Sequence, residues 1–168
     1  MKQFKTLLFA AVLFVGTTGL SVAQSKIAHI NTSDLVAAMP AMKAAQAEIE
    51  KLTKTYEAEI KTMATELDNK IKQYQAEVDT KTEEENQTRA QEVQSMEASI
   101  RQYQQQAQQD LQTKQADLMK PITEKAREAI LKVGRAQGFD YVLDSAAGIT
   151  ILADGKDLLA DVKKELGI

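Results

Sequence analysis

The chain has 168 residues, with 21 basic and 24 acidic side chains and a formal net charge of −3. It contains no cysteine, which excludes disulfides, a thiol nucleophile and a lipid anchor on cysteine. Only 5% of the residues are aromatic, with seven glycines and two prolines, and this composition favours long helices over a large compact core.

The N-terminus has the pattern of a secretory signal peptide. Two lysines precede a short apolar run at 7–15, and small residues mark a cleavage site between Ala23 and Gln24. A membrane anchor is the alternative, but a run of about nine residues is too short to span ~30 Å of hydrocarbon. Removal of residues 1–23 leaves 19 basic and 24 acidic side chains, a net charge of −5. We therefore expect export, no stable membrane insertion and no nucleic-acid binding.

The segment that follows combines a strand and a helix start. Residues 26–31 are β-like, with Ile27 and Ile30 as expected strand residues. A helix begins after them, and Pro40 should kink or restart it. We assign residues 24–40 to a small β-rich body.

An apolar stripe then runs along a predicted hairpin of two long helices. Its spacing repeats every eleven residues, or three helical turns, which predicts a straight or slightly right-handed helix. One stripe on a polar helix must find a partner, and two stripes separated by a polar gap predict an antiparallel arm over residues 41–133. The stripe comprises Ile49, Leu52, Tyr56, Ile60, Met63, Leu67, Ile71, Tyr74, Val78, Val93, Met96, Ile100, Leu111, Leu118 and Ile122.

The register of the arm follows from matching the two stripes. Ile71 should face Ile100, and Met63 should face Ala107, which places the tip near 84–88. Asn86 at the midpoint tolerates the left-handed conformation that ends helices. A slip of eleven residues would match the stripes equally well.

The C-terminal part of the chain returns to the body, which we assign to 24–40 plus 134–168. Residues 139–144 and 149–153, on either side of a turn, predict a β-hairpin. A terminal helix follows, with Asp157 as its N-cap and Gly167 at its end. The expected strand residues here are Tyr141, Val142, Leu143, Ile149 and Ile151.

The predicted fold class is α+β, with a helical arm on a β-body shared between subunits. About fifty residues are near the lower limit for an independent core, and three short strands leave open edges. Association of several chains would solve both problems. We therefore expect an obligate oligomer.

Motifs for catalysis are absent from the sequence. No phosphate-binding glycine loop is present. We interpret the one histidine, His29, as a strand side chain, because the sequence has no second histidine or cysteine to build a metal site. The acidic run 83–85 reads as a solvated tip, since it lacks the spacing and glycine of a calcium loop. We predict no catalytic, metal-binding or cofactor-binding residue, no cofactor and no enzymatic activity.

The layout resembles the Skp/OmpH-like periplasmic chaperones. The resemblance rests on "KIAHINTSDLVAAMPAMKAAQAEIEKL", a charged helical hairpin and "GFDYVLDSAAGITILADGKDLLADVKKELG". It implies a periplasmic homotrimer in which three arms on an intertwined β-body surround a cavity. It also implies an ATP-independent holdase that binds unfolded outer-membrane β-barrel proteins and prevents their aggregation.

The charge of the chain departs from this family, whose best-studied members are strongly basic. Near the tip, two basic side chains stand against six acidic ones, so binding of lipopolysaccharide is not carried over. Our candidates for contact with a client are Tyr103, which lies off the stripe, and the arm lysines Lys54, Lys61, Lys70 and Lys72. Edge packing in the arm is an equally good interpretation of Tyr103.

A structural coiled-coil stalk or adaptor of the cell envelope is the alternative function. Peripheral stalks also use eleven-residue repeats. They retain a membrane helix, whereas this chain has a cleavable signal and C-terminal strands.

Overall fold

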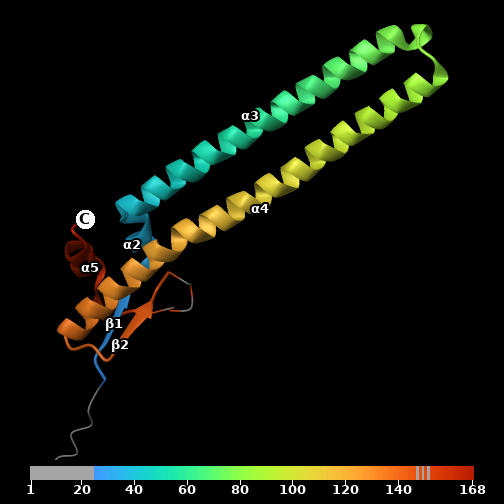
Figure 1. The fold of residues 1–168 in the computed structure, drawn as a ribbon. Coiled ribbons are helices and arrows are strands. Elements are labelled where there is room, and N and C mark those ends of the chain that lie inside the picture. The colour runs from blue at the N-terminus through green and yellow to red at the C-terminus, as the bar shows by residue number, and fades with distance from the viewer. Residues whose placement is uncertain (1–24, 147, 149, 151) are drawn as a thin grey trace, which may run out of the picture.

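The computed structural model describes residues 25–146, 148, 150 and 152–168. A long arm of two helices projects from a small body, to which both ends of the described chain contribute (Figure 1). The predicted signal peptide and its cleavage site at Ala23 and Gln24 lie outside the described residues. The elements are β1 (Ile27–Ile30), α2 (Thr32–Ala38), α3 (Pro40–Glu77), the 3₁₀ turn η1 (Val78–Thr80), α4 (Glu83–Ala136), β2 (Tyr141–Asp144), β3 (Lys156–Asp157) and α5 (Leu159–Leu166).

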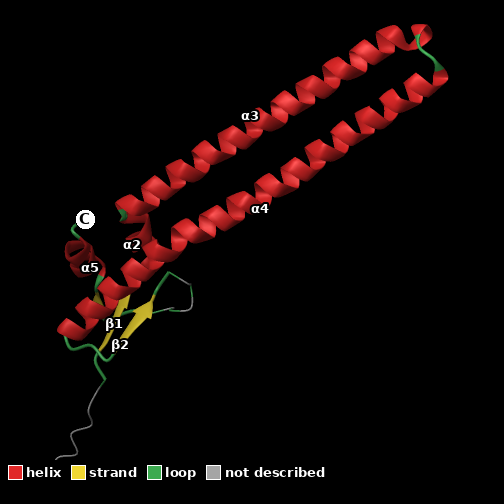
Figure 2. Cartoon of the chain, viewed as in Figure 1, coloured by secondary structure: helices red, strands yellow, loops and turns green. Residues whose placement is uncertain are grey.

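The sheet has β1 at its centre, between β2 and β3. Both neighbours run parallel to β1, and Figure 2 shows β1 and β2 pointing the same way. A parallel pair needs a long crossover, and the whole arm is the crossover from β1 to β2. The antiparallel hairpin predicted for 139–144 and 149–153 is therefore wrong.

The contacts of Ser145 and Gly155 with β1 explain this error. The Ser145 N–H donates to the Ile30 carbonyl at 2.9 Å, so the chain follows β1 to its end. β3 lies on the other edge of β1. Of the predicted second strand, Thr150, Leu152 and Ala153 have no strand structure, and Ile149 and Ile151 lie outside the described residues. A Cβ on Gly155 would lie 2.9 Å from the Ile27 carbonyl oxygen, so glycine permits the close return to β1.

The core of the body lies between the sheet and helices α2, α4 and α5. On β1 the side chains alternate, with Ala28 and Ile30 almost fully buried against the helices. The last turns of α4 contribute residues three or four apart, so the body begins earlier along α4 than the predicted boundary at 134. The main buried residues are Ala28, Ile30, Leu35, Met39, Ile122, Ala126, Ala129, Val133, Leu158 and Val162.

Local signals fix where the body helices begin. The Asn31 side chain accepts from the Asp34 N–H at 3.1 Å and starts α2. Met39 is extended, and Pro40 occupies the first turn of α3, so the helix restarts there as predicted. The N-cap of α5 is Leu158 rather than the predicted Asp157, which ends β3 and whose carboxylate accepts from the Leu159 N–H at 2.8 Å.

Candidate functional site

The arm is the largest exposed feature of the chain, and its seam contains the predicted stripe. All stripe residues are at least partly buried except Val78, which is 47% exposed. Two helices cover each other on one side only, so the seam stays open along both flanks. Ala45, Ala107 and the stripe residue Ile122 are the seam residues that become buried.

The tip of the arm lies at 78–82, not at the predicted 84–88. The helix α4 starts with a capping box, in which the Thr82 hydroxyl accepts from the Glu85 N–H and the Glu85 carboxylate accepts from the Thr82 N–H. Asn86, expected to end a helix, lies in the first turn of α4 and donates its side-chain amide to the Val78 carbonyl. The residues of the polar gap after Thr82 are therefore helical.

The earlier tip also changes the register. Ile71 shares a hollow with Val93 rather than with the predicted Ile100, and Met63 shares one with Ile100 rather than with Ala107. The predicted register is therefore wrong, although the helices and the direction of the hairpin were predicted correctly.

One flank of the seam, which we call the bridged face, is crossed by tyrosine–carboxylate hydrogen bonds. The hydroxyl of Tyr56 donates to Asp110 at 3.0 Å. Tyr74 donates to Glu92 in the same way, and Tyr103 donates to Glu59. Each bond joins α3 to α4.

Ion pairs join the two helices as well. Lys70 lies 2.5 Å from Glu92, Arg89 lies 2.5 Å from Glu77, and Lys114 lies 2.7 Å from Glu48. The guanidinium of Arg89 also lies 4.6 Å from the centre of the Tyr74 ring, within range of a cation–π contact.

These contacts shift the titration of the groups involved. Hydrogen bonding to Lys70 and then to Tyr74 lowers the pKa of Glu92, and Arg89 lowers the pKa of Glu77. The hydrogen bond to Glu92 raises the pKa of Tyr74. Burial, followed by the bond to Asp110, raises the pKa of Tyr56. At neutral pH the Glu92 and Glu77 carboxylates are charged, and the Tyr74 and Tyr56 hydroxyls keep the proton that they donate.

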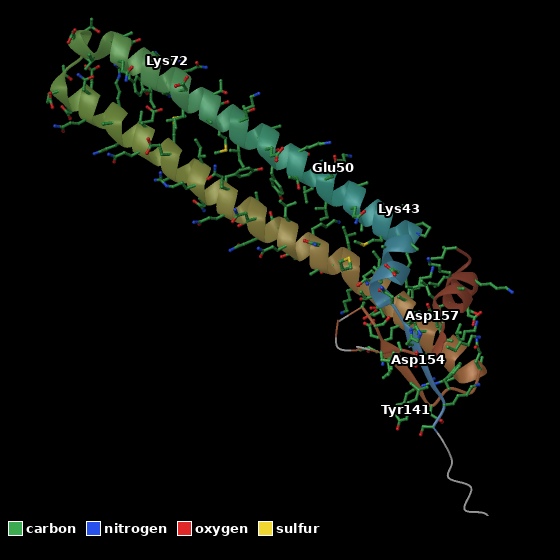
Figure 3. The ribbon with its side chains drawn as sticks, turned by 180° about the vertical axis from the view of Figure 1, so that it is seen from behind. Lys43, Glu50, Lys72, Tyr141, Asp154 and Asp157 are labelled. Atoms are coloured by element: carbon green, nitrogen blue, oxygen red, sulfur yellow. The ribbon has the colours of Figure 1, made fainter. Side chains whose placement is uncertain are left out.

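The residues predicted to meet a client are mostly engaged within the arm. Tyr103 packs edge-to-face on Tyr56 with ring centres 5.9 Å apart, so it is part of hairpin packing. Lys54 pairs with Glu50 and Lys72 with Asp68, each at 2.6 Å along α3. Lys70 turns across the seam, and Lys61 is exposed. Figure 3 shows Glu50 and Lys72 along α3 on the arm.

The other flank of the seam carries an apolar depression near the body, which we call the basal hollow. It has a volume of about 230 Å³. Most of its lining is apolar, and its polar lining residues are two glutamines and Glu50, which pairs with Lys54. The lining residues are Met42, Ala45, Gln46, Ile49, Glu50, Gln115, Leu118 and Met119.

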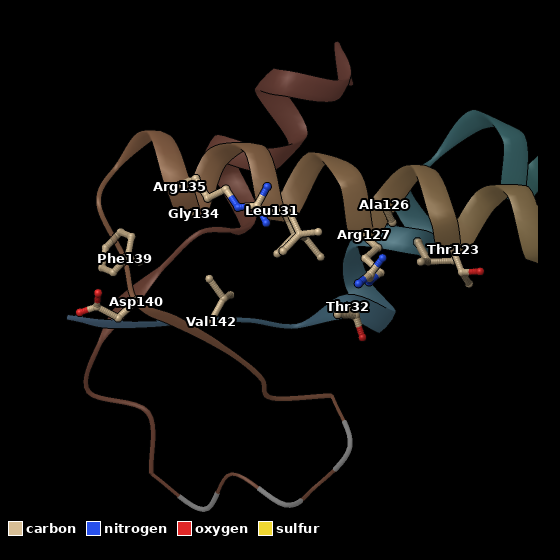
Figure 4. Close-up of a pocket in the computed structure, with 12 residues that line it drawn as sticks. Thr32, Thr123, Ala126, Arg127, Leu131, Gly134, Arg135, Phe139, Asp140 and Val142 are labelled. Carbon is tan, nitrogen blue, oxygen red and sulfur yellow. The ribbon is translucent and has the colours of Figure 1, made fainter. Parts of the chain in front are cut away.

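A groove of about 600 Å³ lies in the body between α4 and the sheet (Figure 4). Leu131 and Val142 lie on opposite walls, and Arg127 and Arg135 flank the α4 side. A Cβ on Gly134 would lie 3.0 Å from Val142, so α4 and β2 are in close contact at one end of the groove.

The outer face of the sheet is apolar and exposed. Ile27 is 46% exposed, Tyr141 59% and Leu143 44%, whereas Ile30 and Val142 lie on the inner face. Leu152, in the crossing loop, is 75% exposed. The predicted strand residues Ile27, Ile30, Tyr141, Val142 and Leu143 therefore all lie in β1 and β2.

Metal sites and membrane spans were sought in the described part of the chain. Among residues 25–146, 148, 150 and 152–168, no group of three or more histidine or acidic side chains is placed to hold a metal ion. None of the helices in these ranges is both long enough and apolar enough to cross a membrane.

Known proteins share this architecture. A family model described as "Outer membrane protein (OmpH-like)" matches residues 26–166. A crystal structure from Caulobacter crescentus CB15, described as a proposed outer membrane chaperone (OmpH-like), superposes with a TM-score of 0.76 at 21% identity. That match covers 90% of this chain and 88% of the other. No curated protein matches the chain closely enough to count as a relative.

Proposed function

Because the chain belongs to the OmpH-like family of outer membrane proteins, we propose that it is an ATP-independent holdase chaperone. It binds unfolded outer-membrane β-barrel proteins in the periplasm and prevents their aggregation. The observation that carries this proposal is a long arm with a seam open along both flanks, on a small body whose outer sheet face is apolar and exposed. The C. crescentus protein, described as a proposed chaperone, has the same fold.

The body joins subunits, and the arms then surround a shared space. Ile27, Tyr141 and Leu143 form an apolar outer sheet face that an isolated chain leaves in water. Contiguous exposed apolar surface of this kind marks an association site. The edges of β2 and β3 add unpaired backbone groups. A homotrimer covers this face and brings three arms together.

The remaining parts of the proposal rest on the sequence. The N-terminal segment delivers the chain to the periplasm as a cleaved signal peptide. Holding requires no nucleotide, since the sequence has no phosphate-binding loop. The mature charge of −5 opposes binding of nucleic acid and of lipopolysaccharide.

The test is an aggregation assay. An unfolded outer-membrane β-barrel protein is diluted from denaturant into buffer with the purified mature protein, with and without ATP. Light scattering is suppressed in proportion to the protein added and equally in both buffers. Undiminished aggregation at excess protein, or suppression only with ATP, would overturn the proposal.

A further inference from the structure

The two flanks of the arm differ in chemistry, and the difference centres on glutamines of α4. Residues 102–115 contain eight glutamines, and all eight are exposed. The two charged residues of this segment point to the seam, where Asp110 accepts from Tyr56 and Lys114 pairs with Glu48. Apart from Lys114, whose side chain is 41% exposed but paired with Glu48, the exposed polar surface of α4 here consists mainly of side-chain amides.

Helix propensity does not account for the missing charges. Glutamate and lysine form helices as well as glutamine does, and α3 uses them freely in the corresponding part of the arm. Glu50, Lys51, Lys54, Glu57 and Lys61 are all exposed there. A surface selected only for solubility would carry charge on both helices.

Helical spacing sorts the glutamines between the two flanks. Gln106 donates to Asp110 at 2.8 Å and so lies at the bridged face. Gln102 and Gln109, four residues before it and three after it, lie on the same side of α4, away from the basal hollow. Gln115 lines the basal hollow. Gln108 lies seven residues before it, on the same side of α4, and Gln104 lies one turn further. We call Gln104, Gln108 and Gln115 the glutamine strip.

We infer that the basal hollow and the glutamine strip form the surface on which the arm holds an unfolded polypeptide. This inference rests on the proposed chaperone function and identifies its contact face. The occupant is an extended segment with apolar side chains, of any net charge. An apolar side chain of the segment enters the hollow, where Met42 and Met119 adapt to its shape.

The strip matches the backbone of such a segment. Each glutamine amide offers two donors and an acceptor, the same groups that peptide bonds offer in return. An uncharged strip neither attracts nor repels a charged client, so its contacts do not depend on client charge or on salt. The bridged face is already used to join the helices, which leaves the strip side for clients.

The experiment places charge on each flank in matched pairs. One variant carries Gln108→Glu and Gln115→Glu, and its lysine counterpart carries Gln108→Lys and Gln115→Lys. The controls carry the same changes at Gln102 and Gln109, which are also exposed and seven residues apart on α4. All four double variants replace glutamine with another good helix former, so folding is retained and is checked by circular dichroism.

The probes are synthetic peptides that alternate leucine with serine, in acidic, neutral and basic versions, and binding is followed by fluorescence anisotropy. The unaltered protein binds all three with similar affinity. The glutamate variant of the strip binds the acidic peptide about fivefold more weakly or worse, and the lysine variant of the strip binds the basic peptide more weakly by a similar factor. The control variants change the affinity for each peptide by less than about twofold. Met119→Gln weakens binding of the neutral peptide, whereas Met96→Gln, on the bridged face, does not.

Two results overturn the inference. Equal effects from strip and control pairs would show that net charge, and not this face, governs binding. No effect from the strip pairs would place the client elsewhere. If the unaltered protein binds no peptide and also fails the aggregation assay, the chaperone function itself fails. If the protein binds peptide but the strip and control variants have equal effects, the chaperone function stands and only the contact face is refuted.

Discussion

The hydroxyl of Tyr56 on α3 donates to the Asp110 carboxylate on α4 across 3.0 Å. Tyr74 with Glu92 and Tyr103 with Glu59 repeat the arrangement along the same flank. The eleven-residue stripe alone permits slipped registers, because it presents similar apolar residues every three turns. The tyrosine–carboxylate bonds are satisfied in one register only, so they select it.

Removal of the hydroxyls should therefore loosen the arm. The double variant Tyr56→Phe and Tyr74→Phe keeps the rings in the seam but leaves Asp110 and Glu92 without these donors. We expect a lower denaturation midpoint and faster amide exchange in α3 and α4, measured by hydrogen exchange. Tyr141→Phe, on the outer sheet face, is the matched control. Unchanged arm protection in the double variant would refute register selection by tyrosines.

Arm stability should fall at both extremes of pH. Glu92 and Glu77 have a lowered pKa in the fold, so their stabilisation is present above the ordinary value of 4.5 and is lost as pH falls through the folded pKa. Tyr74 and Tyr56 have a raised pKa, so their contribution is present below 10.0 and is lost as pH rises through the folded value. Thermal melts across pH measure this. Glu92→Gln should reduce the fall in melting temperature at acid pH. An unaltered fall would contradict the stabilising role of the Glu92 carboxylate.

The body should depend on Leu158, which is fully buried between β3 and α5. Leu158→Ala leaves a cavity in a core that is small to begin with, and we expect a loss of about 2–5 kcal/mol in the free energy of unfolding. Val78→Ala at the exposed tip is the control and should cost little. Denaturant unfolding compares the two, and equal costs would show that the body core is misassigned.

Gly155 should be required for the return of the chain to β1. A Cβ at this position meets the Ile27 carbonyl oxygen at 2.9 Å, and backbone cannot move aside cheaply. Gly155→Ala should displace β3 and lower the melting temperature, whereas Ala153→Gly, nearby in the same loop, should not do so to the same extent. A melting temperature equal to that of the unaltered protein would refute the tight approach.

The sequence predicted those features of the fold that depend on local pattern. The stripe predicted two long helices and their antiparallel course, and Pro40 predicted the restart of the helix. The predicted tip is wrong because the two stripes also match each other in a register centred on 84–88. The Thr82–Glu85 capping box, which is visible in the sequence, marks the start of α4. That signature could have located it.

Other features depend on contacts between distant segments. The parallel pairing of β2 and β3 with β1 depends on how a loop crosses the sheet, and no local pattern specifies this. The two flanks of the arm were also indistinct in sequence, because residues on both sides of a stripe share helical spacing. Tyr103 was placed off the seam for this reason, whereas its ring packs on Tyr56.

Native mass spectrometry of the purified mature protein, mixed with an unfolded outer-membrane β-barrel protein in the absence of nucleotide, measures both the number of chains and the capture of a client. We predict a complex of three chains with one client, formed without aggregation of the client. A body that closes only as an oligomer, together with arms that enclose one chain, gives that mass. An elongated dimer that leaves the client unbound would contradict the account and support a structural stalk.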